Sequence, residues 1–188
     1  MPACAGMTPV LWQNSAYASS ANFARFLAVC TFALVVAVTM PIQEGHAATG
    51  KSGLPIPRFV SLRSDEVNMR TGPGTRYPIE WVLRRRGLPI EVTAEYDVWV
   101  RVRDADGIQG WVQRGMISGR RMAIIHGSMR NLLKDDEPSA PTVARLEIGA
   151  TGKIMSCKKD WCNLQFGKVK GYLRKSEFWG AYPDELIH

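Results

Sequence analysis

Residues 68–74 read Asn-Met-Arg-Thr-Gly-Pro-Gly, and the chain then passes Trp99 before it reaches Gly110-Trp111-Val112. A similarly spaced set follows, with its landmarks at Asn131, Trp161 and Gly171-Tyr172-Leu173. The separation from Asn to Trp is 31 residues in the first set and 30 in the second, and the separation from that Trp to the next marked aromatic residue is 12 and then 11. A pattern that recurs at nearly constant spacing predicts two copies of one small fold.

Between these landmarks the chain reads as short strands separated by turn residues. Residues 89–96 alternate apolar and polar side chains, which is the period of a half-buried strand. Residues 98–103 and 108–113 flank an Asp-Ala-Asp-Gly turn and predict a hairpin. In the second copy we expect strands over 129–133, 142–146, 151–158, 161–166 and 171–174. No long window after the N-terminal region shows a helical period, so the predicted fold class is all-β, with two tandem small barrels or sandwiches.

The N-terminal region has the features of an export signal. Residues 26–40 carry no charge, Arg25 precedes them, and small residues follow at Gly45 and Ala47-Ala48. Fifteen apolar residues are fewer than the roughly 20 that a membrane-spanning helix needs. We therefore predict a cleavable signal peptide over 1–47. An uncleaved N-terminal anchor is the alternative, and it would be the only attachment to a membrane.

Cleavage after Ala47 would leave a basic protein. The predicted mature chain, 48–188, keeps 23 basic and 16 acidic residues, a net charge of +7. An exported protein of this charge meets polyanions such as wall polymers, lipid headgroups and acidic partners. The alternative is that the charge serves only solubility.

Two cysteines remain in the predicted mature chain, Cys157 and Cys162. They flank a four-residue segment of hairpin length, which can place them opposite each other. Because export permits oxidation, we predict one short disulfide. A metal site is the competing reading, but two thiolates without a nearby partner fall short of four ligands. No metal or cofactor is therefore expected.

The motif residues of the first copy resemble the bacterial SH3 (SH3b) domain, an SH3-like barrel common in exported proteins. The resemblance rests on residues 68–74, 99–102 and 110–112. The second copy is degenerate, because Leu133 stands for Arg70, an acidic segment stands for the Gly-Pro-Gly loop, and Tyr172 stands for Trp111. The resemblance implies two tandem SH3-like barrels, at 59–119 and 120–182, after a flexible lead-in over 48–58 and before a tail over 183–188.

The resemblance also implies a function and a place. Family members are often described as cell-wall targeting or peptide-binding modules attached to hydrolases, and we expect a periplasmic or secreted protein. The expected function is non-enzymatic recognition of a cell-envelope ligand, a peptidoglycan peptide or a glycan. A structural adaptor that docks on an envelope protein is the main alternative. No nucleic-acid partner is expected, and the oligomeric state is left open.

A ligand-binding groove is predicted in the first copy, because binding residues often lie on the loops and aromatic faces of small barrels. Its predicted residues are Arg76, Tyr77, Tyr96, Trp99 and Trp111. The alternative for the two tryptophans is half-buried packing. Trp81, in an apolar run, is expected in the core, and Asn68 is expected to satisfy backbone groups of the loop that follows it.

Arginines form the densest charged run. A patch for carboxylates or phosphates is predicted from Arg84, Arg85, Arg86, Arg101 and Arg103. The alternative is a solvated hairpin tip that limits edge aggregation.

Catalysis has little support in the sequence. A thiol peptidase would need a Cys–His pair, but the mature cysteines are predicted to be bridged, and the histidines left are His126 and the terminal His188. We assign no catalytic residues and expect no enzyme. A cell-wall hydrolase is the most remote alternative.

Overall fold

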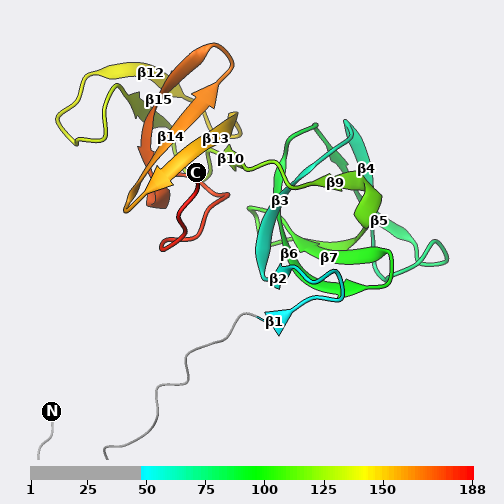
Figure 1. The fold of residues 1–188 in the computed structure, drawn as a ribbon. Coiled ribbons are helices and arrows are strands. Elements are labelled where there is room, and N and C mark those ends of the chain that lie inside the picture. The colour runs from blue at the N-terminus through cyan, green and yellow to red at the C-terminus, as the bar shows by residue number, and fades with distance from the viewer. Residues whose placement is uncertain (1–47) are drawn as a thin grey trace, which may run out of the picture. The chain divides into compact units, whose positions relative to one another are not determined.

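The computed structural model describes residues 48–188, and they are built almost entirely of β-strands (Figure 1). The predicted signal peptide, over 1–47, lies outside the described residues. Within 48–188 no helix is both long enough and apolar enough to cross a membrane.

The first copy forms one seven-stranded antiparallel sheet, in the order β5-β4-β8-β7-β6-β3-β9. A single-turn 3₁₀ helix, η1 (Arg114–Met116), precedes its last strand. The strands are β3 (Arg58–Leu62), β4 (Glu66–Arg70), β5 (Ile79–Arg84), β6 (Pro89–Tyr96), β7 (Trp99–Arg103), β8 (Gln109–Gln113) and β9 (Ile117–Ser118).

The second copy forms a six-stranded sheet, in the order β12-β11-β15-β14-β13-β10. A 3₁₀ helix, η2 (Lys175–Glu177), follows it. The strands are β10 (Met122–Ile124), β11 (Arg130–Leu133), β12 (Thr142–Leu146), β13 (Thr151–Lys158), β14 (Trp161–Phe166) and β15 (Val169–Arg174). Counted along the chain within each copy, the strands have the same order, and the prediction of an all-β fold with two tandem copies is confirmed.

The two copies also share their irregularities. The pairing of β4 with β5 shifts at Met69/Arg70 and that of β11 with β12 at Leu132/Leu133, and in each copy the extra residue lies on the edge strand, Glu80 on β5 and Val143 on β12. A second bulge interrupts β6 and β13 at matching places. A bulge inserts one residue and bends its strand, so repeated bulges mean that the two copies curve alike.

Each copy closes around its own apolar core. Alternate residues of the strands point inward, and they are almost completely buried. In the first copy they include Ile90, Val92, Val100, Val102 and Val112. In the second they include Leu132, Ile154, Leu164 and Leu173. The intervening residues of the same strands point away from these cores.

Trp81 does not lie in the core, and that prediction is wrong. The strand that carries it, β5, is at the edge of its sheet and pairs only with β4. Trp81 is opposite the buried Met69, but no strand covers it on its other side, and 49% of its surface is exposed. An apolar run predicts a buried strand only when neighbours lie on both sides of it.

The lead-in over 48–58 is ordered against the first copy, which corrects the prediction of a flexible segment. Its strands β1 (Ala48–Thr49) and β2 (Pro55–Ile56) form a small hairpin. The carboxylate of Glu95 then accepts hydrogen bonds from the backbone N–H and the hydroxyl of Ser52, both at 2.7 Å. A buried acceptor on β6 therefore holds the lead-in in place.

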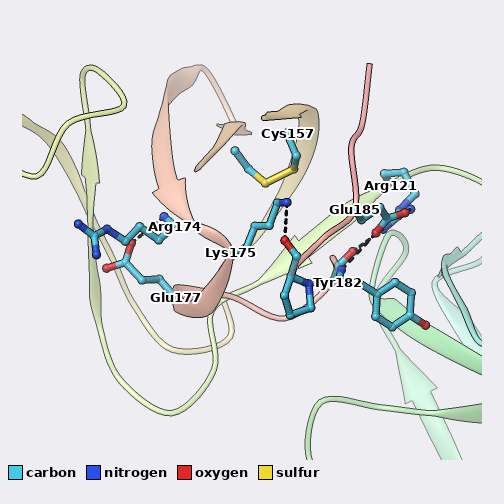
Figure 2. The surroundings of a disulfide bond; sticks show 10 residues. Arg121, Cys157, Arg174, Lys175, Glu177, Tyr182 and Glu185 are labelled. Atoms are coloured by element: carbon cyan, nitrogen blue, oxygen red, sulfur yellow. Dashed lines mark hydrogen bonds and ion pairs between the residues drawn. A yellow bond between two sulfur atoms is a disulfide. The ribbon is translucent and has the colours of Figure 1, made fainter. Parts of the chain in front are cut away.

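The residues predicted as a tail, 183–188, are also packed (Figure 2). The Lys175 ammonium donates to the carbonyl of Pro183 at 2.6 Å, and the guanidinium of Arg121 forms an ion pair with the carboxylate of Glu185. The backbone of Ile187 pairs with that of Cys157. These contacts tie the C-terminal residues to the second copy.

The C-terminal residues contact the first copy as well. The ring of Phe59, on β3, packs against Trp179 and Tyr182, with ring centroids 4.8 and 4.7 Å apart. The Tyr182 hydroxyl donates to Glu91 at 2.8 Å, and Glu91 is nearly fully buried. Burial and this hydrogen bond raise the pKa of Tyr182, so the phenol stays neutral. The two copies are joined through a packed segment as well as a linker.

The predicted disulfide is confirmed. Cys157 and Cys162 face each other across the β13–β14 hairpin and are bonded, with their Cα atoms 4.0 Å apart. Both side chains are buried in the core of the second copy.

Removing the disulfide should destabilise the second copy. Cys157→Ala/Cys162→Ala should lower the free energy of unfolding by about 2 kcal/mol, because the bridge restricts a short loop of the unfolded chain. Urea denaturation with and without reductant measures this. The reductant should lower the stability of the wild type and leave the double variant unchanged. Equal stability of wild type and variant under oxidising conditions would contradict the prediction.

Candidate functional site

Two rows of side chains cross the outer face of the first copy. In one row, Tyr96 lies opposite Trp99, and Trp99 lies opposite Gln113, on neighbouring strands β6, β7 and β8. These residues alternate with the buried valines of β7 and β8, so their side chains point away from the core. The row places two aromatic rings beside an amide on a solvent-facing sheet.

The second row runs beside the first. Trp111 on β8 lies between two arginines, Arg101 on β7 and Arg70 on β4. All three are on the outward side of their strands. An aromatic residue flanked by guanidinium groups on both neighbouring strands offers stacking and charge together.

A shallow pocket of about 160 Å³ opens on this face. Trp99 and Gln113 of the first row line it together with Asn68, Arg70 and Thr75. The antiparallel register that pairs Arg70 with Trp111 places Asn68 opposite Gln113. Two amides and an indole therefore surround one small opening.

The residue that holds the loop after β4 is Arg70 and not Asn68. The loop after β4 is held by Arg70, whose guanidinium donates to the carbonyls of Tyr77 at 2.6 Å and Thr75 at 3.2 Å. The Asn68 side chain makes no hydrogen bond within residues 48–188, so the prediction that it satisfies the loop backbone is wrong. Because Val67 and Met69 point inward, alternation alone would have turned Asn68 and Arg70 outward, and that signal was available in the sequence.

Tyr77 and Arg76 lie on the same loop, next to the pocket residue Thr75. The half-buried Tyr77 ring covers Gly72, where an added Cβ would lie 2.4 Å from the ring. The exposed Arg76 guanidinium is 5.2 Å from the centre of that ring. Its hydrogen bond to the Tyr77 hydroxyl and the nearby Tyr77 and Tyr96 phenols raise the pKa of Arg76. Tyr77 therefore packs within the loop, and Arg76 remains accessible at the surface of the loop.

The five arginines predicted as one patch are divided. Arg84 lies on the edge strand β5, three strands away from β7, which carries Arg101 and Arg103. Four of the five also contact other groups of the protein. Arg84 pairs with Glu66, Arg86 with Asp65, Arg103 with Glu91, and Arg85 donates to the carbonyl of Gly149. Arg101 and Arg103 both lie on the outward side of β7, and of the five only Arg101 belongs to the two rows described above.

The second copy has a different surface at the matching positions. The first row is replaced by Lys158, Trp161 and Arg174. The Arg174 guanidinium lies over the Trp161 ring, 5.1 Å from its centre. The second row is replaced by Leu133, Tyr172 and Asn163, and none of these is an arginine. The pocket there has a volume of only about 90 Å³. Trp99, Trp111 and Trp161 are all half-buried, and the copies differ in that an arginine lies over the ring of Trp161 whereas Trp99 lines the larger pocket.

Residues 48–188 contain no group of three or more His, Cys, Asp or Glu side chains arranged to hold a metal ion. The outer face of the first copy offers stacking, hydrogen bonding and cationic attraction through Trp99, Trp111, Asn68, Gln113 and the arginines.

The family model described as "Bacterial SH3 domain" matches this chain twice, over 63–119 and 127–180. The chain therefore belongs to the bacterial SH3 domain family, with two tandem domains. Domains of this family are generally cell-wall binding modules and are typically extracellular. The disulfide agrees with an oxidising compartment.

Comparison with curated proteins finds no match. Among solved structures, the chain is similar to NlpC1 of Trichomonas vaginalis, with a TM-score of 0.32 and 9% identity over 71% of this chain and 49% of that one. NlpC2 of the same organism gives 0.32 and 8% over 69% and 50%. The chain spans about half the length of each, and similarity at this level carries no conclusion about function.

Proposed function

We propose that this protein is an exported, non-enzymatic module that binds a peptidoglycan peptide or glycan through the outer face of its first copy. The observation that carries the proposal is the pair of rows, Tyr96–Trp99–Gln113 and Arg101–Trp111–Arg70, beside the small pocket. Flat sugar faces and peptide groups pack against the outward sides of indole rings, amides fix their orientation, and arginines bind the carboxylates of wall peptides.

We further propose that the protein is periplasmic or secreted and carries out no catalysis. Membership of a family of generally extracellular domains and a disulfide support a periplasmic or secreted protein, and a signal peptide over 1–47 would deliver it there. Catalysis is not proposed, because the two cysteines of residues 48–188 are bonded to each other and both are buried.

Trp99→Ala should weaken sedimentation of the protein with insoluble peptidoglycan by about tenfold or more, as the loss of a central aromatic contact does at other interfaces. The matched control is Trp161→Ala, the equivalent residue of the second copy, which should change binding by less than about twofold because Arg174 already covers it. Thermal unfolding of both variants shows whether each remains folded.

The alternatives predict other results in the same assay. Loss of sedimentation with Arg84→Ala/Arg85→Ala/Arg86→Ala, but not with Trp99→Ala, would mean simple charge attraction. No sedimentation of the wild type even at low salt, together with an envelope protein recovered by cross-linking, would favour an adaptor over a wall-binding module.

A further inference from the structure

A second depression lies on a different part of the molecule from the outer face of β4, β7 and β8. It has a volume of about 510 Å³ and is bordered by the lead-in, β3, η1, β9 and the residues that follow β9. We call it the arginine groove, after the four arginines that line it: Arg58, Arg63, Arg114 and Arg121.

The arginine groove has an excess of positive charge. Arg58 is paired with Glu95 and Arg121 with Glu185. Arg114 donates only to the neutral carbonyl of Asp97, and the exposed Arg63 has no side-chain partner in the described part of the chain. Two positive charges are thus left without a counter-ion at one groove, which favours an anionic ligand.

Three of the arginines at the groove also carry a buried side-chain N–H without an acceptor. Within residues 48–188, four buried side-chain nitrogens lack a hydrogen-bond partner, and three of them are the Nε atoms of Arg58, Arg114 and Arg121. Because these Nε atoms are themselves buried, the groups that can attract a ligand at the groove are the uncompensated charges of Arg63 and Arg114.

The groove borders a short piece of the β3 edge that has no partner among the described strands. On β3, the N–H of Leu62 donates towards β6 and that of Arg63 donates towards β9. Peptide groups of successive residues face opposite neighbours, so Phe59 faces the β9 side, as Arg63 does. Since β9 pairs only with Ser61 and Leu62, the N–H and C=O of Phe59 have no strand partner. An extended backbone can use them.

Apolar side chains form the rest of the wall. Val60 and Ile117 are buried behind it, and Leu54 of the lead-in is half exposed at the border. A ligand that complements all three features needs a peptide backbone for the strand edge, acidic groups for the two arginines and apolar side chains for the wall.

We propose that the arginine groove binds an extended acidic peptide segment, whose carboxylates face Arg63 and Arg114 and whose backbone pairs with Phe59. In an extended peptide alternate side chains point to opposite faces, so acids can face the arginines while apolar residues face Val60, Ile117 and Leu54. This site is separate from the proposed wall-binding face, and either can fail without the other.

The test uses fluorescence anisotropy with the full chain and three labelled eight-residue probes. The first alternates Glu and Val, the second replaces each Glu by Gln, and the third keeps Glu but carries N-methyl groups on the backbone amides. We expect the first probe to bind at least about tenfold more tightly than either of the others at physiological ionic strength, because the second lacks charge and the third cannot pair with a strand edge.

Variants then locate the binding. Arg63→Glu should weaken the Glu/Val probe by at least about tenfold, whereas Arg145→Glu, the same charge change at an exposed position of β12, should change it less than about twofold. Sedimentation of Arg63→Glu with peptidoglycan should equal that of the wild type, which separates this site from the proposed function.

Several results would overturn the proposal. Equal binding of the Gln probe, equal binding of the N-methylated probe, or equal weakening by Arg63→Glu and Arg145→Glu would each do so. Complete displacement of the Glu/Val probe by inorganic phosphate at unchanged ionic strength would reduce the groove to a site for small anions, and no binding of any probe would leave it a hydrated depression.

Discussion

Gly171→Ala should lower the free energy of unfolding by about 3 kcal/mol, the upper end of what overpacking a tight core costs. A Cβ atom at this buried position would lie 2.4 Å from the carbonyl oxygen of Leu133 and 2.7 Å from Cγ of Leu132. The nearest neighbour is backbone in a paired strand, so it cannot rotate away, and β15 would have to move away from β11.

Urea denaturation measures this loss, and two other glycine variants provide the comparison. At Gly110, the equivalent position of the first copy, the nearest atom is Cγ of Met69 at 2.4 Å. A methionine side chain adapts more easily, so Gly110→Ala should cost less than Gly171→Ala. Gly115→Ala meets no atom within 4 Å and should change stability by less than about 0.5 kcal/mol. Equal losses at Gly171 and Gly115 would refute the steric explanation.

Glu95→Gln should destabilise the protein at neutral pH by about 3 kcal/mol and much less near pH 2. The Glu95 side chain is 1% exposed and accepts hydrogen bonds from Ser52 and, at 2.6 Å, from the Arg58 guanidinium. Burial raises the pKa of this carboxyl, but the donors of Ser52 and Arg58 outweigh it and lower the pKa from 4.5 to about 2.

The sign of the pH effect follows from that direction. A carboxyl whose pKa is lower in the folded state stabilises the protein above its unfolded value, 4.5, and this contribution is lost as the pH falls towards 2. The difference in unfolding free energy between wild type and Glu95→Gln should therefore shrink between pH 4.5 and 2. Glu80→Gln, at an exposed position of β5, is the control and should follow the wild type. Parallel profiles for Glu95→Gln and wild type would contradict the assigned role.

Amide hydrogen exchange provides a second measurement on Glu95→Gln. Because Glu95 holds Ser52 and Arg58, exchange should accelerate in residues 48–58 more than in β7 or β8.

Local patterns predicted the strands well. The bounds expected for residues 89–96, 142–146, 151–158 and 161–166 are those of β6, β12, β13 and β14. Alternation of side chains, turn residues and a constant repeat are all properties of neighbouring residues, so they can be read before the chain is folded. The cysteine pairing was readable for the same reason, because a four-residue separation allows little else than a hairpin.

The charged interior was not predicted. Alternation over residues 89–96 placed Glu91 and Glu95 on the solvent side, yet both carboxylates are buried. A bulge between Val92 and Ala94 changes the register of β6. In addition, Tyr182 covers Glu91 from 91 residues away, and the lead-in covers Glu95 from 43 residues away.

The sequence by itself determined that the chain contains two copies of one small β fold, where their strands run and which cysteines pair, because each depends on residues close together along the chain. The tertiary structure alone decided that Trp99 lines a pocket while Arg174 lies over Trp161, that Arg58 and Arg121 are neutralised while Arg63 is not, and that both ends of residues 48–188 are packed. Those outcomes depend on which distant groups the folded sheets bring within hydrogen-bonding distance, and no local pattern records that.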